Sequence, residues 1–479
     1  MRRLSDLAGE ACARDPMIAG LTADSREVGK NFLFAALPGE VHDGARFIPQ
    51  AEEKGASAIL APPGVTARAP VIHDAEPRRR FAAMAARFYE RQPEIVTGIT
   101  GTNGKTSTAL FAAQLWELAG RTSASLGTLG ARGRGGEDFG APDLYTTPEP
   151  VALHKALRAM SDAGVTRLAM EVSSHGLAQF RADGVRFKAA AFANITRDHL
   201  DFHKDFDAYE NAKARLFTAL LEEDGCAVIN MDGEGAEKML SRVMARGLRR
   251  LTTGAKGSDI RLASARPTET GTALQVVCDG RTLDIALPLI GEFQAENALL
   301  AAGLVVACGE GAADAVAALE KLRPAPGRME RVADLRGGAI YVDYAHTPDA
   351  IASALAALRP HLAGRLIAII GAGGDRDREK RPLMGAAAAA GADAVIVTDD
   401  NPRTEDRAAI RAAVMKGAPD AQEIGDRGAA IAAGAAMLNK GDILLIAGKG
   451  HETGQMVGST KLPFNDAEVA RAAAAAAGD

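Results

Sequence analysis

The sequence predicts an α/β protein with mainly parallel sheets, divided into about three domains. Short, fully apolar runs alternate with longer segments rich in alanine and leucine. This is the pattern of parallel strands that are buried on both faces and connected by helices. The length of 479 residues exceeds one ordinary core and suggests about three domains. A hydrophobic fraction of 47% and a charged fraction of 24% are typical of a soluble globular protein.

The same alternation assigns the individual elements. Residues 250–290 alternate between polar and apolar positions, which indicates antiparallel strands appended to the middle of the chain. The final segment, ARAAAAAAGD, favours a terminal helix. Buried strands are expected at residues 95–100, 167–172, 190–195, 226–230, 365–371, 393–399 and 442–448. Helices are expected at residues 104–119, 150–163, 294–308 and 347–359.

Two segments are candidate domain boundaries. RQPEI (91–95) comes just before a glycine-rich stretch, and RPAPGRME (323–330) interrupts helical patterns with two prolines and a glycine. We therefore expect domains over residues 1–92, 93–327 and 328–479. Each range falls close to the usual size of a domain.

Charge and cysteine content restrict the partners and the compartment. The net charge of −5 and the pI near 6.1 argue against a nucleic-acid partner. The cysteines Cys12, Cys226, Cys278 and Cys308 are scattered and form no CxxC motif, which fits a reducing compartment. No apolar stretch of a secretory signal follows the basic start, and no run of about 18 apolar residues occurs. We expect a cytoplasmic protein with no membrane or nucleic-acid partner.

A glycine-rich segment, GITGTNGKTST (98–108), follows an expected strand and precedes an expected helix. Backbone amides of such a loop and the helix N-terminus bind phosphate, Lys105 adds a charge, and the Thr106 hydroxyl can bind Mg²⁺. Ile99 stands where the general motif has glycine. The loop alone indicates a bound nucleoside triphosphate, which a kinase, a GTPase or a ligase would share. The expected nucleotide-binding residues are Gly101, Thr102, Asn103, Gly104, Lys105, Thr106 and Ser107.

The variant TGTNGKT resembles the phosphate loop of Mur ligases and of folylpolyglutamate synthetases. Further segments resemble Mur ligases along nearly the whole chain, in the order of that family, and together they are highly specific. They are DSREV (24–28), TTPEP (146–150), EVSSHGL (171–177), NITRDHLDFH (194–203), YENAKARLF (209–217), GEFQAEN (291–297), GRME (327–330), DYAHTPD (343–349), GGDRDREKRPLMG (373–385), DNPR (400–403) and GKGHE (448–452).

The resemblance implies an N-terminal domain for the UDP end of a substrate, a central phosphate-loop domain for ATP, and a Rossmann-like C-terminal domain for an amino acid. It implies that ATP phosphorylates a carboxylate and that an amine then attacks the acyl phosphate. DNPR resembles the signature for meso-diaminopimelate, which would be added to the D-glutamate of a UDP-muramoyl dipeptide in peptidoglycan precursor synthesis. The implied partners are these small molecules and ATP, with Mg²⁺ as cofactor and a monomeric chain.

Four residues resemble the metal ligands of the family. Thr106 and Glu171, the latter at the end of an expected strand, suit Mg²⁺ beside a phosphate loop. His199 resembles a second ligand. Lys213 resembles a lysine that CO₂ converts to a carbamate, although helical spacing alone predicts a solvated residue. The resemblance implies catalytic roles for Lys105, Lys213, His199 and Arg328.

Further nucleotide contacts come from the resemblance alone. Asn297 resembles the adenine contact. Arg328, at the second expected boundary, would reach ATP only when the C-terminal domain closes, like an arginine finger. Asp343, Tyr344 and His346 resemble the segment that meets the ribose and phosphates.

The DNPR segment carries the expected amino-acid specificity. Diaminopimelate differs from lysine by one extra carboxylate, and a guanidinium pairs bidentately with a carboxylate. Arg376 and Arg403 would bind carboxylate, and Glu452 would bind an ammonium; each of the three follows an expected strand, where ligands of α/β sheets bind. The expected set is Arg376, Asp400, Asn401, Pro402, Arg403, Gly448 and Glu452.

The resemblance also implies contacts with the muramoyl dipeptide. Tyr145 departs from the pattern, since relatives have asparagine before the two threonines. The expected contacts are Ser25 and His42 for the uridine diphosphate side and Thr146, Thr147, Ser173, Gln179 and Arg181 for the peptide.

Three alternatives remain open from the sequence. A folylpolyglutamate synthetase-like ligase would lack DNPR and the roughly 90-residue domain before the phosphate loop. A lysine-adding Mur ligase usually lacks the arginine at position 403. A nucleotide-dependent binding or switch protein would form no amide product.

Overall fold

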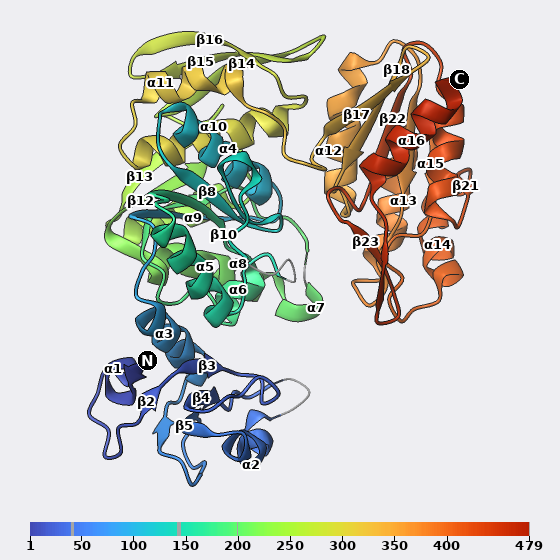
Figure 1. Cartoon of the computed structure of the whole chain (residues 1–479). Coiled ribbons are helices and arrows are strands. Elements are labelled where there is room, and N and C mark those ends of the chain that lie inside the picture. The colour runs from blue at the N-terminus through green and yellow to red at the C-terminus, as the bar shows by residue number, and fades with distance from the viewer. Residues whose placement is uncertain (40–42, 141–144, 199, 479) are drawn as a thin grey trace.

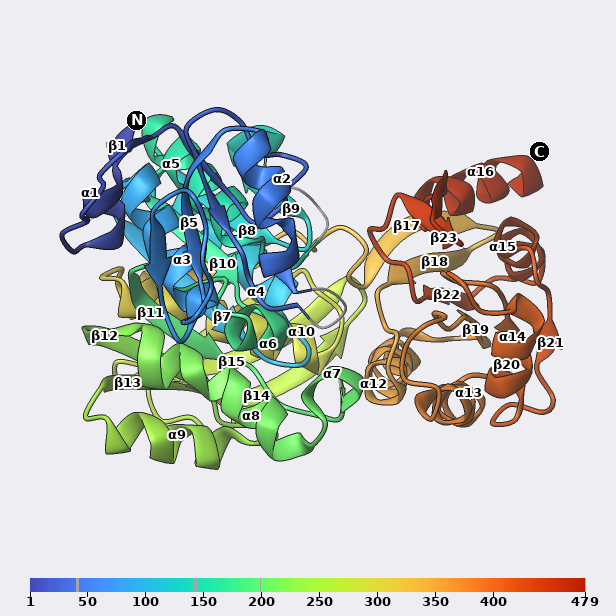
Figure 2. The same ribbon diagram turned by 90° about the horizontal axis from the view of Figure 1, so that it is seen from below.

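The computed structural model describes residues 1–39, 43–140, 145–198 and 200–478. Figure 1 shows an N-terminal domain in blue, a central domain from cyan to yellow and a C-terminal domain in orange and red. Helix α3 leads from the first domain to the second, and Figure 2 shows the third domain beside the second. The expected boundaries at residues 92 and 327 fall between α3 and β7 and between η4 and β17. The division at these residues stays a prediction.

The N-terminal domain is a parallel sheet in the order β3-β4-β5-β6 with helices on both faces. Apolar side chains of α1 and α3 cover one face and those of α2 the other. The elements are β1 (Arg2–Arg3), α1 (Leu4–Ala8), β2 (Met17–Ile18), β3 (Gly20–Thr22), β4 (Phe32–Ala35), η1 (Gly44–Phe47), α2 (Ile48–Glu53), β5 (Ala56–Ala61), β6 (Val71–His73) and α3 (Pro77–Tyr89).

The central domain contains one large sheet in the order β16-β15-β14-β13-β12-β11-β7-β10-β8-β9. The neighbouring strands β13, β12, β11, β7, β10 and β8 are parallel. Strands β14, β15 and β16 form the expected antiparallel extension. The strands are β7 (Ile95–Thr100), β8 (Ser123–Gly127), β9 (Gly130–Gly133), β10 (Arg167–Glu171), β11 (Phe187–Phe192), β12 (Leu221–Asn230), β13 (Arg249–Gly254), β14 (Ile260–Thr268), β15 (Gly271–Cys278) and β16 (Arg281–Leu287).

Helices cover both faces of this sheet. Helices α4 and α10 pack on one face, and α5, α8 and α9 pack on the other, so the parallel strands are buried on both sides as expected. The helical elements are α4 (Lys105–Leu118), η2 (Arg134–Gly136), α5 (Pro150–Asp162), α6 (Ser174–Ala178), α7 (Leu200–His203), α8 (Phe206–Arg215), η3 (Leu216–Leu220), α9 (Ala236–Ala245), α10 (Glu292–Ala307), α11 (Ala312–Ala317) and η4 (Ala318–Lys321).

The C-terminal domain has the sheet order β17-β18-β22-β19-β20-β21, with only its β17 edge antiparallel within the described chain. Helices α12, α13 and α14 cover one face, and α15 and α16 the other (Figure 2). The elements are β17 (Glu330–Leu335), β18 (Gly338–Asp343), α12 (Pro348–Leu358), η5 (Arg359–His361), β19 (Leu366–Ile370), α13 (Lys380–Gly391), β20 (Ala394–Val397), α14 (Arg407–Met415), β21 (Gln422–Glu423), α15 (Arg427–Ala436), β22 (Ile443–Ala447), β23 (Gly454–Val457), β24 (Thr460–Pro463) and α16 (Asp466–Gly478).

One strand is displaced from its expected range. Strand β11 covers Phe187–Phe192, whereas the sequence predicted residues 190–195. The strand ends before the apolar run does, because the segment after Phe192 turns to the phosphate loop. There the Asn194 side chain accepts a hydrogen bond from the Asn103 amide at 3.0 Å. In the described residues, no helix combines the length and apolarity that crossing a membrane requires.

Candidate functional site

A cavity of about 470 Å³ lies where the phosphate loop meets the C-terminal domain. This volume is in the range of small-molecule sites. Its walls come from the loop after β7, from the ends of β10 and β11, from α10 and from the segment after β18. The expected site residues that line it are Thr102, Asn103, Gly104, Lys105, Thr106, Ser107, Thr146, Glu171, Asn297, Arg328 and Asp343.

The phosphate loop has the geometry of an anion site. Ile99 is fully buried in the core of β7, which explains why the strand continues where the general motif has glycine. Gly104 has φ +86° and its missing side chain leaves room for Asn297, which a Cβ atom would strike. Helix α4 starts at Lys105, so its free amides point into the cavity.

Two lysine side chains converge on one carbonyl of this loop. Lys105 Nζ donates to Gly101 O and Thr102 O, both at 2.8 Å, and Lys213 Nζ donates to Gly101 O at 2.7 Å. Burial and then the Lys105 charge lower the pKa of Lys213 well below its usual value. Lys213 is 1% exposed, so the expectation of a solvated helix residue is wrong. The reason is that α8 packs against the sheet with this side turned inwards.

Glu171 joins three elements at the carboxyl end of β10. Its Oε2 accepts hydrogen bonds from Thr106 Oγ1 at 3.0 Å and from Thr128 Oγ1 at 3.2 Å, and its Oε1 accepts from the Thr128 amide at 2.8 Å. The carboxylate is buried, with 2% exposure, beside the first residues of α4. This arrangement provides hydroxyl and carboxylate oxygens next to the phosphate loop.

Arg328 already reaches the phosphate loop in this structure. Its Nη2 donates to Thr106 Oγ1 at 3.1 Å in this arrangement of the domains. The expectation that Arg328 reaches ATP only when the C-terminal domain closes stays a prediction. The cause of the Thr106 contact is the turn that precedes β17: Asp343 accepts from the Met329 amide at 2.6 Å and from the Ala345 amide at 2.8 Å. These bonds hold Arg328 over the cavity. They also occupy the Asp343 carboxylate. Burial raises the pKa of this carboxylate.

The opposite wall carries the amides expected near adenine. Asn297 Nδ2 donates to Gln294 Oε1 at 3.2 Å, and Gln294 Nε2 donates to Arg328 O at 3.3 Å. Helix α10 is thereby connected to the linker before the C-terminal domain. His346 lies on the other side, where burial lowers the pKa of its imidazole.

The expected dipeptide contacts form a second group beside Glu171. Thr147 Oγ1 donates to Glu171 O at 3.2 Å and accepts from the Ser173 amide at 2.9 Å. Arg181 Nη1 donates to Thr147 O at 3.0 Å. Thr146 connects this group to the cavity, because its hydroxyl is 3.2 Å from that of Thr128.

The two terminal nitrogens of Arg181 are engaged by neighbouring groups, whereas its buried Nε has no hydrogen-bond partner in the described part of the chain. Its Nη2 donates to Gln179 Oε1 at 2.6 Å and pairs with Glu149 at 2.9 Å, and its guanidinium lies 4.2 Å from the centroid of the Tyr145 ring. Tyr145, at the position where the sequence departs from the family pattern, therefore packs on the expected carboxylate-binding arginine. A substrate carboxylate at Arg181 would compete with Glu149.

Ser25 is separate from these two groups. Ser25 lies in the N-terminal domain, where its hydroxyl donates to Gln50 Oε1 at 2.8 Å. His42 and His199 fall outside the described residues.

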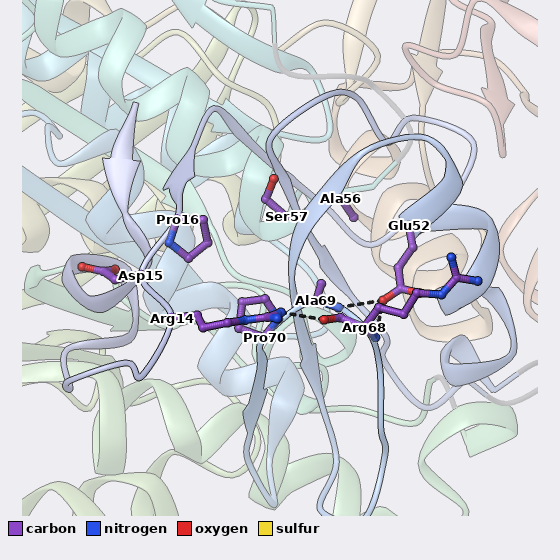
Figure 3. Close-up of a pocket in the computed structure, with 9 residues that line it drawn as sticks. All are labelled: Arg14, Asp15, Pro16, Glu52, Ala56, Ser57, Arg68, Ala69 and Pro70. Atoms are coloured by element: carbon purple, nitrogen blue, oxygen red, sulfur yellow. Dashed lines mark hydrogen bonds and ion pairs between the residues drawn. The ribbon is translucent and has the colours of Figure 1, made fainter.

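A further pocket of about 600 Å³ lies in the N-terminal domain, between the segment before β2 and the starts of β5 and β6 (Figure 3). None of the expected site residues that the structure describes lines it. Arg14 Nη2 donates to Arg68 O at 2.6 Å, and Glu52 Oε1 accepts from the amides of Arg68 and Ala69 (Figure 3). These bonds lie within the N-terminal domain, and no residue that lines this pocket also lines the cavity at the phosphate loop.

The expected diaminopimelate residues come together in the C-terminal domain. We call Arg376, Asp400, Asn401, Arg403 and Glu452 the C-terminal cluster. Arg403 Nη1 donates to Gly374 O at 2.7 Å. Burial and the neighbouring Arg376 guanidinium lower the pKa of Arg403. Two guanidinium groups that repel each other form a site for an anion.

The anionic part of the C-terminal cluster is held by hydrogen bonds. Asn401 Nδ2 donates to Glu452 Oε2 at 2.8 Å, and Asn401 Oδ1 accepts from the Met456 amide at 2.9 Å. Pro402 follows directly, and Gly448 N donates to Asp343 O at 3.1 Å. Gly448 thereby connects the cluster to the strand that ends at the cavity.

Stacked side chains link the cavity to the C-terminal cluster. The Arg328 guanidinium lies 4.2 Å from the centroid of the Tyr344 ring. The centroids of the Tyr344 and His451 rings are 5.3 Å apart. Glu452 follows His451 directly. Arg403 does not line the cavity that Lys105 lines, but the contacts from Thr106 through Arg328 and Tyr344 to His451 lead from that cavity to the chain neighbour of Glu452.

The sequence reasoning missed four residues of the site. Asn194 and Asp198 belong to the segment NITRDH, and Lys449 belongs to GKGHE, so the quoted motifs contained their signal. Asp198 pairs with Lys380 of α13 at 3.9 Å across the two domains. For Thr128 the signal was only its position directly after a strand.

Family models match all three domains. A Mur ligase family, catalytic domain model matches residues 17–89, the Mur ligase middle domain matches residues 99–305, and the Mur ligase, glutamate ligase domain matches residues 327–450.

Similar proteins cover the chain from end to end. A UDP-N-acetylmuramoyl-L-alanyl-D-glutamate--2,6-diaminopimelate ligase of Caulobacter vibrioides is 49% identical and covers 97% of both chains. A ligase of the same name from Bradyrhizobium diazoefficiens is 48% identical over 99% of both. A solved structure of a ligase with this name is 32% identical, with a TM-score of 0.72 over 99% of both chains.

A folylpolyglutamate synthase of Mycobacterium tuberculosis, solved with ADP and AMPPCP, shares the fold at 22% identity and a TM-score of 0.62, but covers 78% of this chain. The family models together span most of the chain, and the closely similar relatives span nearly all of it. The chain belongs to the Mur ligase family.

Proposed function

We propose that this protein is the ATP-dependent ligase that adds meso-diaminopimelate to the D-glutamate of UDP-N-acetylmuramoyl-L-alanyl-D-glutamate. The observation that carries the proposal is the row of contacts from the phosphate loop through Arg328 and Tyr344 to the C-terminal cluster. It joins a site for phosphates to a site with both guanidinium and carboxylate groups. The names of the relatives agree with this substrate.

The first step would activate the substrate carboxylate. The γ-carboxylate of D-glutamate attacks the γ-phosphorus of ATP, the bond to ADP breaks, and an acyl phosphate forms. Amides of the phosphate loop, Lys105 and Arg328 would stabilise the charge on the transferred phosphoryl group. Asp343 acts on this step by holding the turn that carries Arg328.

The oxygens at the loop fit Mg²⁺. Thr106 Oγ1 and Glu171 Oε2 are 3.0 Å apart, and hydroxyl and carboxylate oxygens are the ligands this ion prefers. Bound there with ATP phosphates, Mg²⁺ would offset the repulsion between the triphosphate and the attacking carboxylate. His199 is proposed as a further ligand from the family resemblance.

Lys213 is proposed to carry a carbamate. CO₂ adds only to a neutral amine, and a buried amine that shares the Gly101 carbonyl with Lys105 is held away from its charged form. The carbamate would be an anion beside Lys105, where it would relieve the repulsion between two ammonium groups and offer oxygens to the metal.

The dipeptide would lie between the N-terminal domain and the group around Glu171. We propose that Thr146, Thr147, Ser173 and Gln179 hold the peptide and that Arg181 binds its carboxylate in place of Glu149. For the uridine diphosphate end, Ser25 and His42 remain proposals from the family resemblance.

The second step would join the amino acid. The amine of diaminopimelate attacks the acyl phosphate, phosphate leaves with the bonding electrons, and the amine loses one proton. Arg376 and Arg403 would bind the distal carboxylate, Glu452 the distal ammonium, and Asp400, Asn401, Pro402 and Gly448 would complete the site. The half of diaminopimelate that carries the distal groups would thus determine which amino acid is accepted. The other half would present the reacting amine.

We further propose that the chain acts in the cytoplasm as a monomer on small molecules, without a membrane or nucleic-acid partner. The net charge of −5 and the dispersed cysteines support this proposal.

The test is a ligation assay with purified protein, Mg²⁺, ATP and the UDP-muramoyl dipeptide, offered diaminopimelate and lysine in parallel. We expect ADP, phosphate and a product whose mass corresponds to addition of diaminopimelate. A lysine product of equal yield would favour the lysine-adding ligase. Nucleotide binding without any amide product would favour a switch protein.

A further inference from the structure

Lys449 is a completely buried cation at the centre of the C-terminal cluster. Its side chain is 0% exposed, although lysine is almost never fully buried unless it is paired. Neither the family resemblance nor the proposed reaction assigns it a role. Its position in the GKGHE segment, directly after β22, brings it beneath residues that would bind the amino acid.

Three side chains of the cluster surround the Lys449 ammonium. Lys449 Nζ donates to Asn401 Oδ1 at 3.0 Å and to Glu452 Oε2 at 2.8 Å, and it lies 3.6 Å from Asp400 Oδ1. These are the amide and both carboxylates of the cluster. The ammonium therefore compensates the charge of two acidic residues that the proposed function assigns to ligand binding.

The same bonds fix the orientation of Asn401. Its Oδ1 accepts from Lys449 and from the Met456 amide, so the side-chain NH₂ must point to Glu452. Glu452 Oε2 is then held by two donors, whereas its Oε1 has no hydrogen-bond partner within the described parts of the chain. One oxygen of Glu452 is positioned by the protein and the other is left for a ligand.

We infer that Lys449 is a specificity-determining residue that favours diaminopimelate over lysine. Its charge weakens the attraction of the Asp400 and Glu452 carboxylates for a distal ammonium that has no carboxylate beside it, as in lysine. The inference rests on the proposed function. With Lys449 present, the ammonium of an amino acid meets a partly neutralised pair of carboxylates. Tight binding then also needs a distal carboxylate on Arg376 and Arg403, which diaminopimelate has and lysine lacks.

Removal of the charge should change selectivity in one direction. In Lys449→Met, Asp400 and Glu452 lose the cation that lies against both of them, and only the charges of Arg403 and Arg427 remain to compensate them. The more negative pair attracts the distal ammonium of either amino acid more strongly and repels the distal carboxylate that only diaminopimelate carries. Lys449→Gln keeps a hydrogen-bond donor near Asn401 and Glu452 but also lacks the charge, so it separates charge from orientation. Lys416→Met, at an exposed lysine of the same domain, is the matched control.

The experiment measures kcat/KM for diaminopimelate and for lysine, and KM for ATP, in the wild type and the three variants. We expect the ratio of the two kcat/KM values to fall at least about tenfold in both Lys449 variants, with KM for ATP changed less than about threefold. Lys416→Met should keep the wild-type ratio. An unchanged ratio in Lys449→Gln would overturn the role of the charge.

A substrate series on the unmodified protein tests the same idea if the variants do not fold. 2-Aminopimelate keeps the distal carboxylate and lacks the distal ammonium, so the inference predicts that it is used better than lysine. Preference for lysine over 2-aminopimelate would contradict it. A wild type that forms no amide at all would refute the proposed function, whereas a wild type that adds diaminopimelate with no change in the variants refutes this inference alone.

Discussion

At the scale of single residues, Arg403 carries the expected choice of amino acid. Replacing it with alanine should raise KM for diaminopimelate roughly 10- to 100-fold, because a bidentate, partly buried carboxylate contact is lost. KM for ATP should change little, since Arg403 does not line the cavity at the phosphate loop. Steady-state kinetics with each substrate varied in turn would measure both effects.

Arg471→Ala is a suitable control for this variant. Arg471 lies in the same domain and forms an exposed pair with Glu330 at 3.1 Å, which contributes little. Equal increases of both KM values in Arg403→Ala would indicate a general loss of structure rather than a lost substrate contact.

Substitutions of Lys213 distinguish a carbamate at this position from a simple positive charge. Lys213→Ala should lose roughly 100-fold or more of the activity, as is usual when a group that orients a metal site is removed. Lys213→Arg keeps a positive charge but cannot form a carbamate, and should be equally inactive. Small carboxylic acids should partly restore Lys213→Ala. Substantial activity of the arginine variant would rule out the carbamate.

At the scale of secondary-structure elements, the apolar strands could be predicted well and the ends of the functional loops could not. Strand β7 begins and ends where the sequence predicted, because five of its six residues, IVTGIT, are β-branched and a glycine-rich loop follows it. Strand β11 was shifted, because the decisive contact of Asn194 with Asn103 is far away in sequence. The burial of Lys213 was missed for the same reason.

The candidate site shows the same limit. Motifs located the phosphate loop, Glu171 and the C-terminal cluster, since each lies at the end of a predicted strand or after it. They did not reveal that Arg328 already contacts Thr106, or that Glu149 occupies Arg181. These contacts depend on the angle between domains and on side-chain competition, which a linear pattern does not contain.

Helix α5 contains a group that should make the fold sensitive to acid. Burial lowers the pKa of His154 to about 4, and its ring nitrogen lies 3.3 Å from Asp183 O. Because the folded pKa is below the unfolded value, the unfolded state binds the proton first as pH falls from about 6.5 towards 4. The contribution of His154 to the free energy of unfolding is therefore fully present above pH 6.5. About 2 kcal/mol of it is lost when the pH falls to 5.

His154→Gln should remove this part of the acid sensitivity. The free energy of unfolding should fall less between pH 7.5 and pH 5 in the variant than in the wild type, whatever the cost of the substitution at neutral pH. Denaturant unfolding followed at the two pH values would measure the difference.

At the scale of the whole molecule, two ion pairs between described residues join the central and C-terminal domains. Lys380–Asp198 is largely buried, with side-chain exposures of 17% and 9%, whereas Arg197–Glu379 is exposed, at 57% and 80%. Exposed pairs are screened by water and salt, and buried pairs are less so. The two pairs should therefore contribute unequally to the working arrangement of the domains.

Lys380→Met should accordingly reduce kcat/KM for ATP at least about tenfold, while Arg197→Ala should reduce it less than about threefold. The activity of Arg197→Ala should also depend less on salt concentration than that of the wild type. A larger loss in Arg197→Ala than in Lys380→Met would contradict the assignment of Lys380 to the domain contact.

The central claim is that ATP activates the substrate carboxylate at the phosphate loop before the amine from the C-terminal cluster attacks it. The most direct measurement uses UDP-muramoyl dipeptide with ¹⁸O in the γ-carboxylate of D-glutamate and determines the mass of the released phosphate. The acyl phosphate route transfers one ¹⁸O atom to each phosphate per amide formed. Phosphate that contains no ¹⁸O, while the amide product accumulates, would contradict it.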